Sequence, residues 1–144
     1  MANAIYNSFK RDIQNGSIDL DTDDIKVMLV TSTYTPDIDT HTKRSDITNE
    51  VTASGYTAGG SSLITATVTS DNANDKGVFD ADDISWSAST ITARGAVLYK
   101  ARGGASSADE IIAYLDFVTD KQSNGGNFNL VFNVNGILTL AWYN

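Results

Sequence analysis

Residues 19–24 (DLDTDD) place carboxylates at alternate positions, the spacing at which a calcium-binding loop presents its oxygen ligands. An EF-hand loop beginning at Asp19 would need glycine at its sixth position and a bidentate glutamate at its twelfth. The chain has Asp24 and Val30 at those positions. We therefore interpret the segment as a solvated turn before a strand and predict no metal site in it.

A second group of oxygen-bearing side chains occurs in residues 71–75 (DNAND) and 80–83 (DADD). These side chains could bind Ca²⁺ if turns brought them together. Asp and Asn side chains also hydrogen-bond to the backbone of the turns in which they occur, which explains the same residues without an ion. We predict turns here and no bound metal.

Residues suited to nucleophilic or phosphate chemistry are sparse. The chain has no cysteine, and its single histidine, His41, is accompanied by no Gly-x-Ser-x-Gly motif, so we expect an exposed loop histidine. Residues 55–60 (GYTAGG) lack the Lys-Ser/Thr end of a phosphate loop, and a need for positive φ explains their glycines. No pair among the 18 acids is singled out for glycoside hydrolysis. We predict no catalytic residue and no cofactor, and hence a protein that is not an enzyme.

Composition limits the classes of partner. The 144 residues fit one domain, and 41% hydrophobic content is typical of a folded chain. A net charge of −8 is repelled by nucleic-acid phosphates and anionic lipid, and the nearest basic candidate, Lys43-Arg44, is too small to offset it. We interpret that pair as solvated loop charge. The chain shows no apolar run near the roughly 20 residues of a membrane span and no signal-peptide pattern. We expect no nucleic-acid or membrane partner, and synthesis in the cytoplasm of the producing cell.

The N-terminal residues 1–16 are expected to form a helix or arm. Ile5, Phe9 and Ile13 recur every four residues and form one stripe of an amphipathic helix, for which Asn15-Gly16 is a suitable end. The stripe is narrow. The simpler interpretation is that it packs on the protein's own sheet, and the alternative is that it docks on a neighbouring subunit.

Residues 32–50 contain Pro36 and few apolar side chains, which predicts a long loop excursion with a helical turn near residues 44–47. A loop of this length in a compact domain is usually functional or ordered by a partner.

The strand-like runs organise the rest of the chain. Residues 90–117 hold two such runs joined by a glycine-containing connection, which predicts an antiparallel hairpin. Its apolar run at 96–99 is expected to be buried on both faces. Further strands are expected at residues 25–31, 64–69, 78–86 with a break at the acids, 128–132 and 137–142, the last two joined as a hairpin by Asn135-Gly136. With one N-terminal helix, these strands predict a mainly β, single-domain antiparallel β-sandwich or barrel-like sheet spanning residues 1–144.

Several segments together resemble a family of small structural proteins of tailed bacteriophages. They are residues 3–10 (NAIYNSFK), 25–30 (IKVMLV) with 33–37 (TYTPD), 55–60 (GYTAGG), 79–83 (FDADD) and 92–96 (TARGA). The resemblance runs over nearly the whole chain and implies a virion component with no catalytic residues. The small, acidic, β-rich build is similar to capsid decoration (cement) proteins, which sit outside a shell made by a major capsid protein, often as trimers.

This resemblance leads us to expect a decoration protein on the capsid exterior that binds the major capsid protein and is a homo-oligomer, with a trimer favoured. A tail, tail-tube or head-tail connector protein is the first alternative, and a carbohydrate-binding β-sandwich on the virion surface is the second. Trp86 and Trp142 are expected in the core or on a sheet face, although aromatic residues at a chain end also anchor interfaces. The candidate contacts with another subunit or partner are Ile5, Phe9, Ile13, Pro36, Trp142 and Tyr143.

Overall fold

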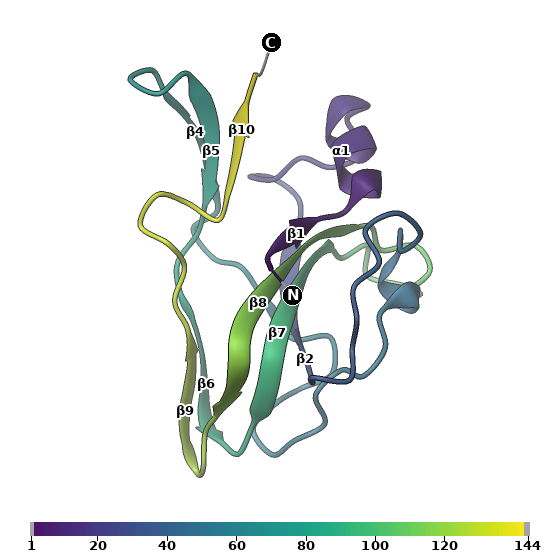
Figure 1. The fold of residues 1–144 in the computed structure, drawn as a ribbon, viewed down its shortest axis with the longest axis vertical. Coiled ribbons are helices and arrows are strands. Elements are labelled where there is room, and N and C mark those ends of the chain that lie inside the picture. Colours follow the sequence, from purple (N-terminus) through teal and green to yellow (C-terminus); the bar gives the residue numbers. More distant parts are fainter. Residues whose placement is uncertain (1, 143–144) are drawn as a thin grey trace.

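The computed structural model describes residues 2–142 of the chain (Figure 1). The regular elements, in chain order, are β1 (Ala4–Ile5), α1 (Asn7–Gln14), β2 (Ile25–Val30), the 3-10 helix η1 (Arg44–Asp46), β3 (Ser61–Ser62), β4 (Thr67–Asp71), β5 (Lys76–Asp80), β6 (Ile84–Ser89), β7 (Thr92–Lys100), β8 (Ile111–Gln122), β9 (Gly126–Leu130) and β10 (Leu138–Ala141). Every strand pairing is antiparallel. The predicted mainly β fold with one short helix near the N-terminus is confirmed.

The hairpin expected at residues 90–117 forms the centre of the largest sheet, whose strand order is β1-β8-β7-β2-β3. Successive side chains of residues 96–99 enter two apolar clusters on opposite sides of β7, and each is at most 2% exposed. The consecutive apolar run is therefore buried on both faces, as predicted. The second strand of the hairpin, β8, continues beyond the predicted end to Gln122.

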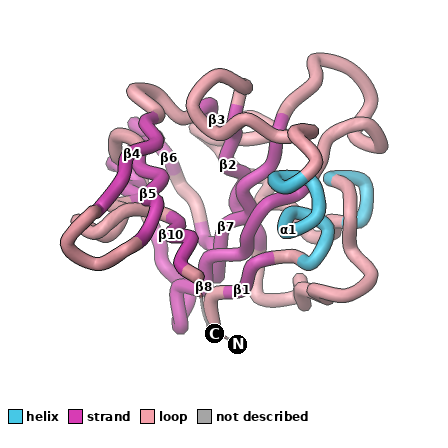
Figure 2. The backbone as a smooth tube through the Cα atoms, turned by 90° about the horizontal axis from the view of Figure 1, so that it is seen from above, coloured by secondary structure: helices cyan, strands magenta, loops and turns pink. Residues whose placement is uncertain are grey.

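The larger apolar cluster lies between this sheet and the layer that contains β5, β6, β9 and β10 (Figure 2). Trp86 of β6 and Phe128 of β9 meet edge to face in it, with ring centroids 6.1 Å apart. Both rings are buried alongside Leu29 and Leu98 of the central sheet. The expectation that Trp86 belongs to the core is confirmed.

The smaller cluster lies on the opposite side of the sheet, where the excursion of residues 32–50 contributes Tyr34 and Ile47. The Tyr34 hydroxyl lies 2.7 Å from the hydroxyl of Tyr6, which is fully buried. The helical turn predicted in the excursion is present as η1. The long loop is thus a cover for the second face of the sheet.

Residues at the N-terminus are part of the core. β1 pairs with β8, and α1 begins only at Asn7, so the prediction that Ile5 lies on the helix is wrong. Phe9 is 7% exposed, and Ile13 packs against the same cluster. The helix ends at Gln14, with Asn15 as its C-cap, and Gly16 follows with φ of 78°, as predicted. The stripe packs on the protein's own sheet, which is the simpler of the two interpretations.

The hairpin predicted for the last two strands is wrong. Residues 133–136 do form a turn, in which the Gly136 N–H donates to the Asn133 carbonyl at 2.9 Å, but the flanking strands do not pair with each other. β9 pairs with β6, and β10 pairs with β5. The break predicted between β5 and β6 is present. Asp83, which lies in this break, accepts a hydrogen bond at Oδ1 from the N–H of Phe132, which follows β9, at 2.8 Å. Each of the two C-terminal strands therefore pairs with a strand from the middle of the chain instead of with its neighbour in sequence.

Candidate interaction surface

The acid-rich turn predicted at residues 19–24 is held by its own side chains. Asp23 Oδ2 accepts a hydrogen bond from the Asp19 N–H at 2.7 Å and pairs with Lys100 Nζ at 2.7 Å. In the second group, Asp71 accepts from Asn74 at 2.8 Å, the side-chain bonding expected of a turn. Across residues 2–142, no group of three or more His, Asp or Glu side chains is placed to hold a metal ion.

The prediction of an exposed loop histidine is wrong. His41 is half-buried and stacks on Tyr34 with ring centroids 5.8 Å apart, and its Nδ1 lies 3.0 Å from the Tyr34 hydroxyl. The Asp37 N–H donates to the same nitrogen at 3.3 Å. Burial raises the pKa of Tyr34 to about 12. The Tyr6–Tyr34–His41 chain is therefore part of the contact between the excursion and the sheet.

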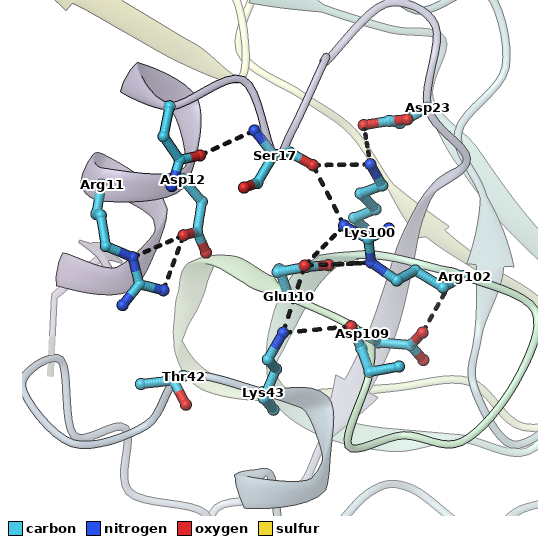
Figure 3. A network of polar contacts seen from close by, with 12 residues as sticks. Arg11, Asp12, Ser17, Asp23, Thr42, Lys43, Lys100, Arg102, Asp109 and Glu110 are labelled. Atoms are coloured by element: carbon cyan, nitrogen blue, oxygen red, sulfur yellow. Dashed lines mark hydrogen bonds and ion pairs between the residues drawn. The ribbon is translucent and has the colours of Figure 1, made fainter.

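Lys43 and Arg44 are paired with acids, which corrects their interpretation as solvated loop charge. Arg44 Nε lies 2.7 Å from Asp109 Oδ2, and Lys43 Nζ lies 3.3 Å from Glu110 Oε1. Arg102 contacts both Glu110 oxygens with bonds of 2.8 to 3.1 Å (Figure 3). Both acids lie just before β8 and are at least 90% buried. The network therefore joins the excursion to the tip of the β7–β8 hairpin.

The charge of Glu110 is strongly favoured by these contacts. Burial raises its pKa, but the hydrogen bonds from Arg102 and from its own backbone, with the Lys43 ammonium, outweigh burial and bring the pKa to about 2. Lys100 and Arg102 also donate to the Ser17 carbonyl, so the network reaches the segment after α1 (Figure 3). These acids and bases satisfy one another, and we assign the network a structural role.

Two shallow cavities open on the surface of the described residues. One of about 170 Å³ is lined by Pro36 and Arg94, together with the edges of Tyr34 and Tyr114, which are at most 4% exposed. The other, of about 300 Å³, lies between β8 and β9 beside Phe117. Pockets that bury a small molecule usually enclose about 300–1,000 Å³ and are lined mainly by hydrophobic and aromatic side chains. The first cavity is smaller than this range, and the second lies at its lower limit.

The most unusual surface is the sheet of strand order β10-β5-β4, which projects beyond the central sheet (Figure 1). Its edge strand β4 begins at Thr67, three residues later than predicted, and residues 67–70 are exposed on both faces. Val68 is 48% exposed, Leu140 of β10 is 72% exposed, and Trp142 after β10 is 87% exposed. A sheet that is exposed to water on both faces buries little apolar surface and gains little stability from it. Such a sheet is therefore expected to be stabilised by a partner that covers it.

The pairing register places the largest apolar side chains of this sheet on one face, whereas Val78 and Ala141 belong to the other. Val68 and Leu138 both pair with Phe79, and Leu140 pairs with Gly77, so these residues share a face. Phe79 at the base of that face is buried in the main core, and the face becomes exposed toward Leu140. We call this the distal face: Val68, Ser70, Gly77, Leu138 and Leu140.

The distal face carries no charge, although the chain has a net charge of −8. The charged residues of the three strands, Asp71, Lys76 and Asp80, belong to the other face, where Asp71 and Lys76 pair at 3.7 Å. An uncharged apolar patch within an acidic protein is typical of the centre of a protein–protein interface.

The candidate contacts predicted from the sequence are not brought together. Phe9 is in the core, Ile5 and Ile13 are half-buried against it, and Pro36 lines the small polar cavity. Trp142, expected in the core or on a sheet face, directly follows β10 and is 87% exposed, so it is not in the core, and Tyr143 lies outside the described residues. Sequence reasoning missed Val68 and Leu140. Their alternation with threonine was visible, but it did not reveal which face would be left uncovered.

Comparisons of the chain with models of protein families, with curated proteins and with solved structures find no match. No helix within residues 2–142 is long and apolar enough to cross a membrane.

Proposed function

We propose that this protein is a structural component of a tailed-bacteriophage particle, a capsid decoration protein that binds the outer surface of the major capsid shell. The observation that carries the proposal is the projecting sheet, whose uncharged distal face exposes Val68 and Leu140 and whose strand β10 is followed by the exposed Trp142. The resemblance of the chain to small phage structural proteins supplies the class of particle.

The rest of the molecule suits such a role. The central sheet is covered by apolar clusters on both sides, and the excursion is tied to it by ion pairs whose acids are buried, which favours a rigid body. A rigid body that repeats on a symmetric shell can bind each site weakly and still stabilise the shell, because many copies act together. The distal face then acts as the contact with the shell.

The first experiment measures the number of copies of this chain relative to the major capsid protein in purified particles. A decoration protein is present in hundreds of copies, in fixed ratio to the capsid protein and accessible to antibody on the shell. About a dozen copies or fewer, or labelling along the tail, would contradict the proposal and favour a connector or tail protein.

A second experiment tests the distal face. Particles lacking the protein are mixed with the purified protein or with Val68→Asp, which places a charge on the distal face. Thr69→Asp is the matched control, because the neighbouring residue is also exposed on β4 but points to the other face. We expect Val68→Asp to lose attachment at least tenfold and Thr69→Asp to retain it. Equal binding by both variants would show that the distal face is not the contact.

The carbohydrate-binding alternative has lost one of its two aromatic candidates, because Trp86 is 6% exposed and cannot stack on a sugar. Glycan-array binding that disappears in Trp142→Ala, without loss of fold, would favour that alternative over capsid attachment.

A further inference from the structure

The outer edge of β10 is a strand edge without the usual protection. Within the described residues, β10 pairs with β5 on one side and with no strand on the other. Alternate residues of an edge strand direct N–H and C=O groups outward, and natural proteins protect such edges with charges, proline, bulges or very short strands. The β10 residues Leu-Thr-Leu-Ala include no charge and no proline, and their register with β5 is regular.

Within residues 2–142, the other edge strands each carry at least one protective feature. β1 and β3 are two residues long, β4 ends in Asp71, and β6 has a register irregularity before Ser89, next to Ala88 with φ of 48°. The outer side of β9 is flanked by the end of β8 across the 300 Å³ cavity. β10 therefore differs from the other edges.

We propose that β10 pairs antiparallel with β10 of a second copy of this chain, which joins two three-stranded sheets into one of six strands. The pairing is self-complementary, as a two-fold symmetric interface requires. It concerns the strand edge and holds whether or not the distal face binds a capsid.

Symmetry determines what such a pairing does with the apolar side chains. When a two-fold axis runs perpendicular to the joined sheet, it passes between one residue of β10 and the same residue of the second copy. Either Leu140 then faces Leu140 of the second copy, or Thr139 faces Thr139. In either register the two distal faces lie on the same side of the joined sheet. The two exposed patches, each including Leu140 and Val68, merge into one apolar surface.

Charge favours a second copy over an ionic partner at this edge. Two molecules that each carry −8 repel each other where their acids meet, but β10 brings no charge into the contact. The nearest charges on β5, Lys76 and Asp80, lie on the face opposite Leu140. A four-residue strand pairing buries less than the roughly 800 Å² per partner of a standard interface, so we expect a dimer of micromolar affinity.

Single cysteines test the pairing, because the chain has no cysteine of its own. Residues directly opposite across an antiparallel pair have Cα atoms about 4.5–5.5 Å apart, within the range of a disulfide. Under mild oxidation we expect Thr139→Cys or Leu140→Cys, whichever lies on the axis, to form a covalent dimer. Thr69→Cys on the other edge strand is the control and is expected to remain monomeric. Failure of both β10 variants to exceed this control would overturn the proposal.

Analytical ultracentrifugation of the unmodified protein over a range of concentrations supplies the second measurement. We expect a monomer–dimer equilibrium, with dissociation constant raised at least tenfold by Leu140→Lys and unchanged by Thr69→Lys. A protein that stays monomeric at hundreds of micromolar, or forms the trimer that the family resemblance implies, would contradict strand pairing at β10. Loss of capsid binding with the dimer intact would refute the decoration role alone.

Discussion

Replacing Glu110 by glutamine tests the charged network that holds the excursion on the sheet. The Glu110 side chain is 9% exposed and bonds to Arg102 at 2.8 Å, while Lys43 lies 3.3 Å away. Burial alone would raise its pKa, but the hydrogen bonds and the two cations lower it from an ordinary 4.5 to about 2. Glutamine keeps the shape and loses the charge, so the two cations remain without their shared carboxylate.

The size of the effect follows from that pKa. Each pKa unit corresponds to about 1.4 kcal/mol, which gives about 3 kcal/mol for the full change. Arg102 is 41% exposed and Lys43 is 32% exposed, so solvent screens part of the attraction. We expect Glu110→Gln to lower the free energy of unfolding by about 2 kcal/mol at pH 7.

The pH dependence has a definite sign. A carboxylate whose pKa is lowered in the folded state contributes stability above its unfolded pKa, and that contribution is lost as the pH falls through the folded value. Urea denaturation of both proteins from pH 7 to pH 2 should therefore show a constant difference down to about pH 5. The difference should then shrink between pH 4.5 and pH 2.

Asp120→Asn is the matched control, because Arg94 and Asp120 pair at 2.8 Å but both side chains are more than a third exposed. Such an exposed pair contributes about 0.2–1 kcal/mol. A Glu110→Gln effect that is as small as the control, or that does not change with pH, would refute the assignment of the stabilisation to the Glu110 charge.

Three further changes test the packing, each followed by urea denaturation at pH 7. Gly60→Ala should lower the free energy of unfolding by more than about 3 kcal/mol, because a Cβ at this φ of +73° would collide with the Val27 carbonyl. Gly103 has a similar φ of +77° but open space around it, so Gly103→Ala should cost about 1 kcal/mol. Equal costs would contradict the clash. Tyr34→Phe should cost about 1–3 kcal/mol, since it leaves the buried Tyr6 hydroxyl without its partner, and a neutral result would contradict the importance of that bond. Phe9→Ala should cost about 3–5 kcal/mol because the ring fills the main core, and a loss below 1 kcal/mol would indicate that the N-terminal helix is dispensable.

Local sequence features determined several parts of this fold. Four consecutive apolar residues at 96–99 require burial on both faces of a strand, because successive side chains point to opposite sides. The Asn15-Gly16 pair ends the helix since both residues tolerate the conformation that follows a helical terminus. Glycines at residues 55, 59 and 60 mark the corner, and all three have positive φ.

The tertiary structure alone decided which strands pair and which faces remain exposed. Asn135-Gly136 has the composition of a hairpin turn, yet β9 and β10 pair with β6 and β5. A turn restrains only a few residues, whereas these pairings join residues that are 37 to 65 positions apart in the sequence. Lys43 and Arg44 became ion-pair partners because the excursion folds back on the acids at the start of β8. The exposure of Val68 and Leu140 is also a tertiary effect. The sequence of a strand determines which residues share a face, but whether that face is covered depends on where the neighbouring layers end.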